Sequence, residues 1–179
     1  QLAPICLKLT PICLFFLLFY PYTKRFTFLC HYFLGVALAM APAGGYIAVT
    51  GELPFGIILL SGGVCLWIGS FDVIYGSQDR QFDLDHKLHS MATQFGVANA
   101  HKIAAFFHFI SILCFIGAGI YFDLSFIYYI GVLIAILTLI YQHSLITPYD
   151  FSRLTQVYFM RNGIVSIVIF VFTLIDILS

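Results

Sequence analysis

Six apolar segments, each of about twenty residues, follow one another along the chain, and polar residues, proline or glycine separate them. A helix needs roughly 20 mostly apolar residues to cross a lipid bilayer. The sequence therefore predicts an all-α integral membrane protein with six transmembrane helices. We expect these helices at residues 4–22, 28–49, 55–75, 101–122, 124–142 and 157–178.

The composition agrees with a membrane protein, since 61% of the 179 residues are hydrophobic and only 9% are charged. The mean hydropathy is +1.01, far above that of a soluble domain. These values exclude a nucleic-acid-binding domain, a secreted disulfide scaffold and a disordered tail. The cysteines stand singly in apolar stretches without metal or disulfide spacing, so we interpret them as packing residues.

The basic residues fall on one side of the predicted bundle. With six crossings, the segments that follow the first, third and fifth helices share a side, and seven of the eight basic residues lie in or beside them: Lys24, Arg25, Arg80, Lys87, Lys102, Arg153 and Arg161. Lys8 alone is left for the other side. The positive-inside rule then makes the basic side cytoplasmic and the C-terminus external.

The second predicted helix contains a break signal at Pro42, followed by Gly44 and Gly45. Proline removes an amide donor, and glycines permit close approach of a second backbone. We predict a kink packed against a neighbouring helix, and a gate is the alternative interpretation.

Acidic residues gather where the third helix enters the longest polar insertion, residues 76–99. Asp72, Tyr75, Asp79 and Asp83 are spaced i, i+3, i+7 and i+11, which on a continuous helix places them on one face. Three carboxylates are therefore expected to point together. A charged residue near the end of an apolar helix costs free energy on membrane insertion, so we expect Asp72 to have a specific role there.

Clustered carboxylates repel one another, and a hard divalent cation removes that repulsion. Mg²⁺ is usually held through one or two carboxylates, with water and substrate phosphate oxygens completing its shell. The alternative is a solvated acidic loop neutralised by Arg80 and Lys87. A basic pair, Lys24 and Arg25, closes the first helix on the same side, where it could dock phosphates. Simple anchoring at the membrane surface is the other interpretation of this pair.

The six histidines form no tight metal-ligand motif, since an i, i+3 pair such as His86 and His89 is weak evidence. We interpret His86 as a solvated loop residue. For His89 and the adjacent Ser90, a role on the substrate side and a structural role both stay open.

Two stretches taken together carry a family resemblance. The first is the run Tyr-Pro-Tyr-Thr-Lys-Arg-Phe-Thr at 20–27, followed by Gly35 and the Pro-Ala-Gly-Gly of 42–45. The second is Phe71-Asp72-x-x-Tyr75-x-x-x-Asp79-x-x-x-Asp83, with Leu88-His89-Ser90 and Phe95-Gly96 after it. In these features the chain resembles the UbiA superfamily of intramembrane aromatic prenyltransferases, in its 4-hydroxybenzoate polyprenyltransferase-like branch.

The resemblance implies a fold of nine transmembrane helices with two aspartate-rich motifs, of which the six helices here resemble the fourth to the ninth. Residues 1–179 would then be a single, partial UbiA-type domain. The first motif of the family, Asn-Asp-x-x-Asp-x-x-x-Asp, has no match in the chain. We expect that motif and three further helices before Gln1.

The resemblance also implies roles for the residues of the two stretches. Asp72, Asp79 and Asp83 would bind Mg²⁺, with Asp72 and Asp79 catalytic. The diphosphate of a polyprenyl donor would meet the metal and four basic residues, Lys24, Arg25, Arg80 and Lys87. Tyr75 would contact phosphate, shield an allylic cation with its ring or pack on its own helix face, and His89 and Ser90 would face the substrate.

The implied function is transfer of a polyprenyl group from polyprenyl diphosphate to 4-hydroxybenzoate or a related aromatic precursor of ubiquinone or menaquinone. The expected location is a bacterial inner membrane, with the active-site loops cytoplasmic and the prenyl tail between apolar helices. Two alternatives are a catalytically inactive fragment and a transporter or channel segment. Transporters generally place ionisable residues near the membrane midplane, whereas the acids here lie at helix ends and in loops.

Overall fold

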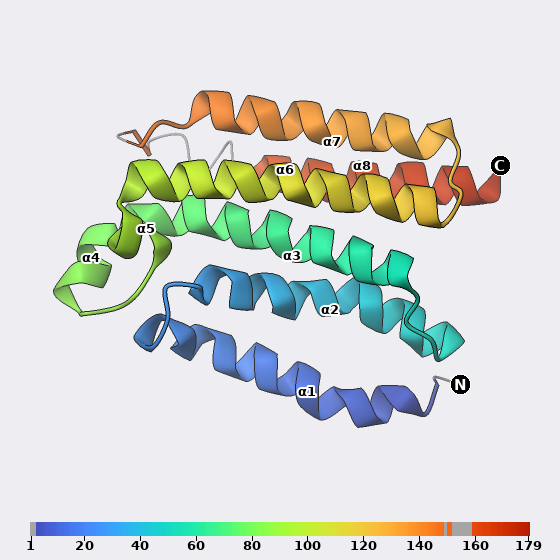
Figure 1. The fold of residues 1–179 in the computed structure, drawn as a ribbon, viewed down its shortest axis with the longest axis horizontal. Helices are drawn as coiled ribbons and strands as arrows, with labels where there is room; N and C mark the ends of the chain where they lie inside the picture. The colour runs from blue at the N-terminus through green and yellow to red at the C-terminus, as the bar shows by residue number, and fades with distance from the viewer. Residues whose placement is uncertain (1–2, 149, 152–158) are drawn as a thin grey trace. The chain divides into compact units, whose positions relative to one another are not determined.

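A computed structural model of the protein describes residues 3–148, 150–151 and 159–179. It contains six long helices, each apolar and long enough to cross a membrane, so the prediction of six spanning helices is confirmed. Figure 1 shows them as α1 Ile5–Phe19, α2 Cys30–Thr50, α3 Phe55–Gly76, α6 Val97–Tyr121, α7 Phe126–Leu145 and α8 Phe159–Leu178.

Four short elements connect the long helices. They are the 3₁₀ turns η1 (Tyr20–Arg25) and η2 (Ser77–Asp79) and the helices α4 (Arg80–Asp85) and α5 (Met91–Phe95). The predicted polar insertion is therefore largely folded. Its last helix has a clear local cause, because Ser90 and Thr93 form a capping box at the start of α5 and Gly96, at φ +77°, follows its end.

The chain divides into two units, Gln1–Cys114 and Phe115–Ser179, with the boundary inside α6. In the first unit α2 packs on α3 in antiparallel fashion, with α1 on the other side of α2 (Figure 1). Gly35 permits this approach, since a Cβ there would lie 2.3 Å from the carbonyl oxygen of Cys65. The part of α6 that belongs to the first unit is tied to α3 by Ser111 Oγ, which donates to the Gly63 carbonyl at 2.7 Å.

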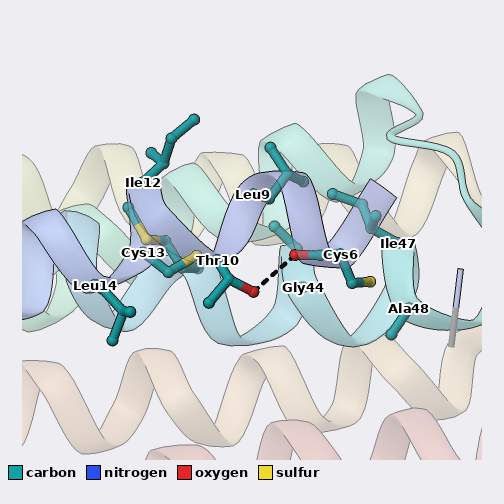
Figure 2. Close-up of a pocket in the computed structure, with 11 residues that line it drawn as sticks. Cys6, Leu9, Thr10, Ile12, Cys13, Leu14, Gly44, Ile47 and Ala48 are labelled. Carbon is teal, nitrogen blue, oxygen red and sulfur yellow. Dashed lines mark hydrogen bonds between the residues drawn. The ribbon is translucent and has the colours of Figure 1, made fainter. Parts of the chain in front are cut away.

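The expectation of close packing at Gly44 and Gly45 is wrong. The α-helix runs from Cys30 to Thr50 through Pro42, and a Cβ at either glycine would meet nothing within 4 Å. The reason is that this half of α2 borders an open space, a groove of about 410 Å³. Figure 2 shows α1 and α2 residues around that groove, among them Cys6, Thr10, Cys13, Gly44 and Ile47.

In the second unit, α7 and α8 pack as an antiparallel pair. The carboxylate of Asp176, near the end of α8, accepts hydrogen bonds from the backbone amides of Ser125 at 2.9 Å and Tyr128 at 3.1 Å, and from the Ser125 hydroxyl. This carboxylate thus caps the first turn of α7. Arg161 of α8 lies over the Tyr141 ring at 3.9 Å, whereas Arg153 lies outside the described residues.

Candidate functional site

The basic run and the acidic insertion meet at one end of the first unit, where η1, the end of α3, η2 and α4 come together (Figure 1). The backbone amide of His89 donates to the Lys24 carbonyl at 2.7 Å. The Cys30 thiol, at the start of α2, donates weakly to the His89 carbonyl at 3.5 Å. Backbone contacts therefore hold the end of the acidic loop against η1.

Lys24 and Asp83 form an ion pair at this end. The Lys24 Nζ lies 3.1 Å from each carboxylate oxygen of Asp83. The Asp83 side chain is almost fully buried, at 1% exposed, whereas that of Lys24 is 30% exposed. A buried carboxylate requires such a partner, since an unpaired charge there would be costly.

Asp72 is paired differently, with a histidine 41 residues away. The Nδ1 of His31, in the first turn of α2, lies 2.7 Å from Asp72 Oδ2. The His31 side chain is 2% exposed and that of Asp72 is 28% exposed. The imidazole fits because residue 76 is glycine, where an added Cβ would lie only 2.7 Å from His31 Cε1.

Asp79 is the exposed member of the acidic set. It occupies the N-cap position of α4, where its side chain makes no cap hydrogen bond. Within residues 3–148, 150–151 and 159–179, no three His, Cys, Asp or Glu side chains form a group that could hold a metal ion together. The expectation that the three carboxylates point together therefore needs correction. The prediction from the spacing assumed one continuous α-helix, whereas the 3₁₀ turn η2 separates α3 from α4.

The other predicted diphosphate-binding residues stand in three distinct settings. Arg25 is exposed, 5.8 Å from the centre of the Tyr22 ring. Arg80 uses its Nε to donate to the Ala92 carbonyl at 3.0 Å, which ties η2 and α4 to α5. Lys87 is exposed and has a left-handed backbone, at φ +54°. Among the described residues, Lys24 is the one member of these four that has a carboxylate partner.

The three predicted substrate contacts differ in exposure. Tyr75 is half-buried and stacks on Phe71 with 6.1 Å between ring centres. The His89 side chain is exposed. Ser90 is fully buried, and its Oγ accepts from the Thr93 amide at 3.2 Å, so the structure gives this hydroxyl a capping role.

The sequence interpretation missed His31. The histidine has no motif around it, and its partner Asp72 is far away in the chain. A weak signal existed. A histidine at the start of an apolar helix needs a polar partner, and Asp72 lies near the end of an apolar helix on the same side of the membrane.

Comparisons with known proteins place the chain in a family. Residues 1–164 match the UbiA prenyltransferase family. A 4-hydroxybenzoate octaprenyltransferase of Shewanella sediminis is 32% identical over 82% of this chain and 51% of its own length. One of Nitrosospira multiformis is 30% identical over 95% of this chain and 58% of its own length. The chain thus spans about half the length of these curated relatives.

A solved structure agrees with this assignment. The apo structure of a UbiA homolog from Aeropyrum pernix K1 is 26% identical, with a TM-score of 0.86 over 98% of this chain and 66% of that one. Its similarity covers both units described above. With its six spanning helices, the chain is an integral membrane protein that belongs to the UbiA prenyltransferase family.

Proposed function

We propose that the protein transfers a polyprenyl group from polyprenyl diphosphate to an aromatic quinone precursor, 4-hydroxybenzoate or a related acceptor. The observation that carries this proposal is the end of the first unit, where the Lys24–Asp83 pair adjoins a segment that also bears Asp72 and the exposed Asp79. Membership of the UbiA family supports it, and so does the activity for which the two relatives are named, 4-hydroxybenzoate octaprenyltransferase. In this proposal both units are parts of one UbiA-type domain.

The carboxylates of Asp72 and Asp79 are donors of the kind that a hard divalent cation such as Mg²⁺ prefers. Asp72 keeps Oδ1 outside its bond to His31, and Asp79 offers an exposed carboxylate. Two carboxylates suffice, because Mg²⁺ takes its remaining ligands from water and substrate phosphate. Asp83 would join them only by sharing its oxygens with Lys24. When bound, the cation supplies positive charge to the diphosphate oxygens as they leave.

The basic side chains of the protein would also bind the diphosphate. Lys24 and Arg25 lie next to each other on η1, and Arg80 uses one of its five donors on the Ala92 carbonyl. With the exposed Lys87, these groups would bind and orient the diphosphate. The half-buried ring of Tyr75 would face the allylic end of the donor.

The reaction breaks the bond between the allylic carbon of the donor and a diphosphate oxygen, and the diphosphate leaves with the electron pair. An electron-rich ring carbon of the acceptor then forms the new carbon–carbon bond, and that ring position releases its proton. We place the reaction in a bacterial inner membrane, with the loops of the first unit on the cytoplasmic side, as the basic residues favour.

The test is transfer of a radiolabelled polyprenyl group to 4-hydroxybenzoate by the complete natural chain. A double variant, Asp72→Ala with Asp79→Ala, is expected to abolish transfer and its dependence on Mg²⁺. Asp85→Asn is the matched control, because Asp85 is an exposed acid of the same segment that bonds only to Gln81 among the described residues. Unchanged transfer by the double variant would refute the assigned roles.

A further inference from the structure

We propose that His31 is a positioning residue, which fixes the carboxylate of Asp72 through Nδ1 and leaves the other carboxylate oxygen for a divalent cation. This inference rests on the proposed function, because it takes Asp72 as a cation ligand. It assigns His31 no contact with substrate.

The hydrogen bond runs from His31 to Asp72. An ionised carboxylate only accepts, so at 2.7 Å from Asp72 Oδ2 the Nδ1 of His31 is the donor. The donor comes from α2 and the acceptor from α3, and the approach of these helices at Gly35 is tight. The hydrogen bond therefore holds Asp72 against α2, which packs closely on α3. Such partners of metal-binding side chains hold them in the orientation that binding requires.

The imidazole of His31 is itself held in place by packing. His31 is 1% exposed, and its ring occupies the space left by the missing side chain of Gly76. A ring enclosed in this way has little freedom to turn. Its position, and with it the position of the Asp72 carboxylate, is thus fixed by packing as well as by the hydrogen bond.

The other ring nitrogen of His31 differs from Nδ1 in its surroundings. His31 Nε2 is buried and has no hydrogen-bond partner among the described residues. Burial of an unpaired polar atom disfavours folding, and an apolar side chain would avoid it. We interpret the hydrogen bond to Asp72 as the reason why a histidine, and not an apolar residue, occupies this position. His108, another buried histidine of the same unit, instead bonds through Nε2 to the backbone carbonyl of Trp67 at 3.1 Å.

The experiment measures binding of Mn²⁺, a paramagnetic substitute for Mg²⁺, to the complete chain in detergent by electron paramagnetic resonance. His31→Leu removes the donor and is expected to weaken Mn²⁺ binding about 10- to 100-fold, as loss of a partner of a metal ligand does. His31→Asn places an amide nitrogen close to the position of Nδ1 and is expected to restore most of the affinity. His108→Leu is the matched control, expected to keep wild-type affinity.

The outcomes separate the inference from the proposed function. Wild-type affinity in His31→Leu, or equal losses in His31→Leu and His31→Asn, overturns the positioning role even if the wild type transfers prenyl groups. Binding that depends on both Asp72 and His31, in a chain that transfers no prenyl group, supports the positioning role and overturns the function. Mn²⁺ binding unaffected by Asp72→Asn overturns both. If His31→Leu does not fold, Gly76→Ala displaces the ring, and wild-type affinity there refutes the inference.

Discussion

The two halves of α2 pack in opposite ways. Where α2 begins, His31 and Gly35 pack closely on α3, and charged side chains pair across helices. Where α2 approaches its end, Gly44 and Ile47 border the apolar groove beside α1. One end thus holds fixed polar groups, and the other leaves apolar space.

Under the proposed function, this difference would suit an amphipathic lipid substrate. A diphosphate needs charged groups in fixed positions, whereas an isoprenoid chain needs only apolar surface. The comparison predicts that substitutions at the polar end change activity, and that equally small substitutions beside the groove change little.

Asp79→Asn is expected to reduce prenyl transfer by at least about 100-fold, because it removes the exposed carboxylate of the predicted acidic set and keeps the side-chain volume. Thr10→Val is the counterpart beside the groove. The Thr10 hydroxyl bonds to the carbonyl of Cys6 in its own helix, so transfer is expected to stay near the wild-type rate. Initial rates at saturating donor measure both. A large loss in Thr10→Val alone would reverse the comparison.

Gly35→Ala and Gly44→Ala place the same methyl group in the two halves of α2. At Gly35 the new Cβ would lie 2.3 Å from a backbone oxygen of Cys65, which cannot turn away. We expect a loss of about 3 kcal/mol in the free energy of unfolding.

At Gly44 nothing lies within 4 Å, so alanine is expected to be neutral or to stabilise the helix by up to about 1 kcal/mol. Denaturation in detergent, followed by circular dichroism, measures both variants. Equal destabilisation would mean that α2 packs closely along its whole length.

Lys24→Met is expected to destabilise the protein by about 2 kcal/mol, because the buried Asp83 carboxylate loses its cation. The partial exposure of Lys24 keeps the loss below that of a fully buried pair. Adding Asp83→Asn to Lys24→Met removes the unpaired charge, and part of the stability should return. A cycle of the two single variants and the double variant measures the coupling. Additive losses would show that the pair contributes no stability.

Much of the fold followed from local pattern, since a run of twenty apolar residues leaves the backbone few options other than a spanning helix. The boundaries of α3 and α7 lie within a few residues of the predicted ones. The packing partners of glycines did not follow. Gly44 and Gly35 look alike in the sequence, and only the position of the neighbouring helix decides which one permits close approach.

The candidate site was predictable in its residue types and not in its pairing. The spacing of Asp72, Asp79 and Asp83 indicated one helical face, but a 3₁₀ turn changes the angle between successive residues. The partners His31 and Lys24 are distant in the chain and depend on how the helices pack.

Ser90→Ala distinguishes a structural role of the Ser90 hydroxyl from a substrate contact at the polar end. Loss of the capping hydroxyl is expected to cost about 1 kcal/mol of stability, while KM for the aromatic acceptor stays unchanged. Ser90→Thr, which keeps a hydroxyl able to cap α5, is the matched control and should be close to the wild type. If instead Ser90→Ala raised KM and left the thermal unfolding midpoint unchanged, the hydroxyl would serve the substrate. The capping box at Ser90 and Thr93 would then be secondary, and the polar end would extend to the start of α5.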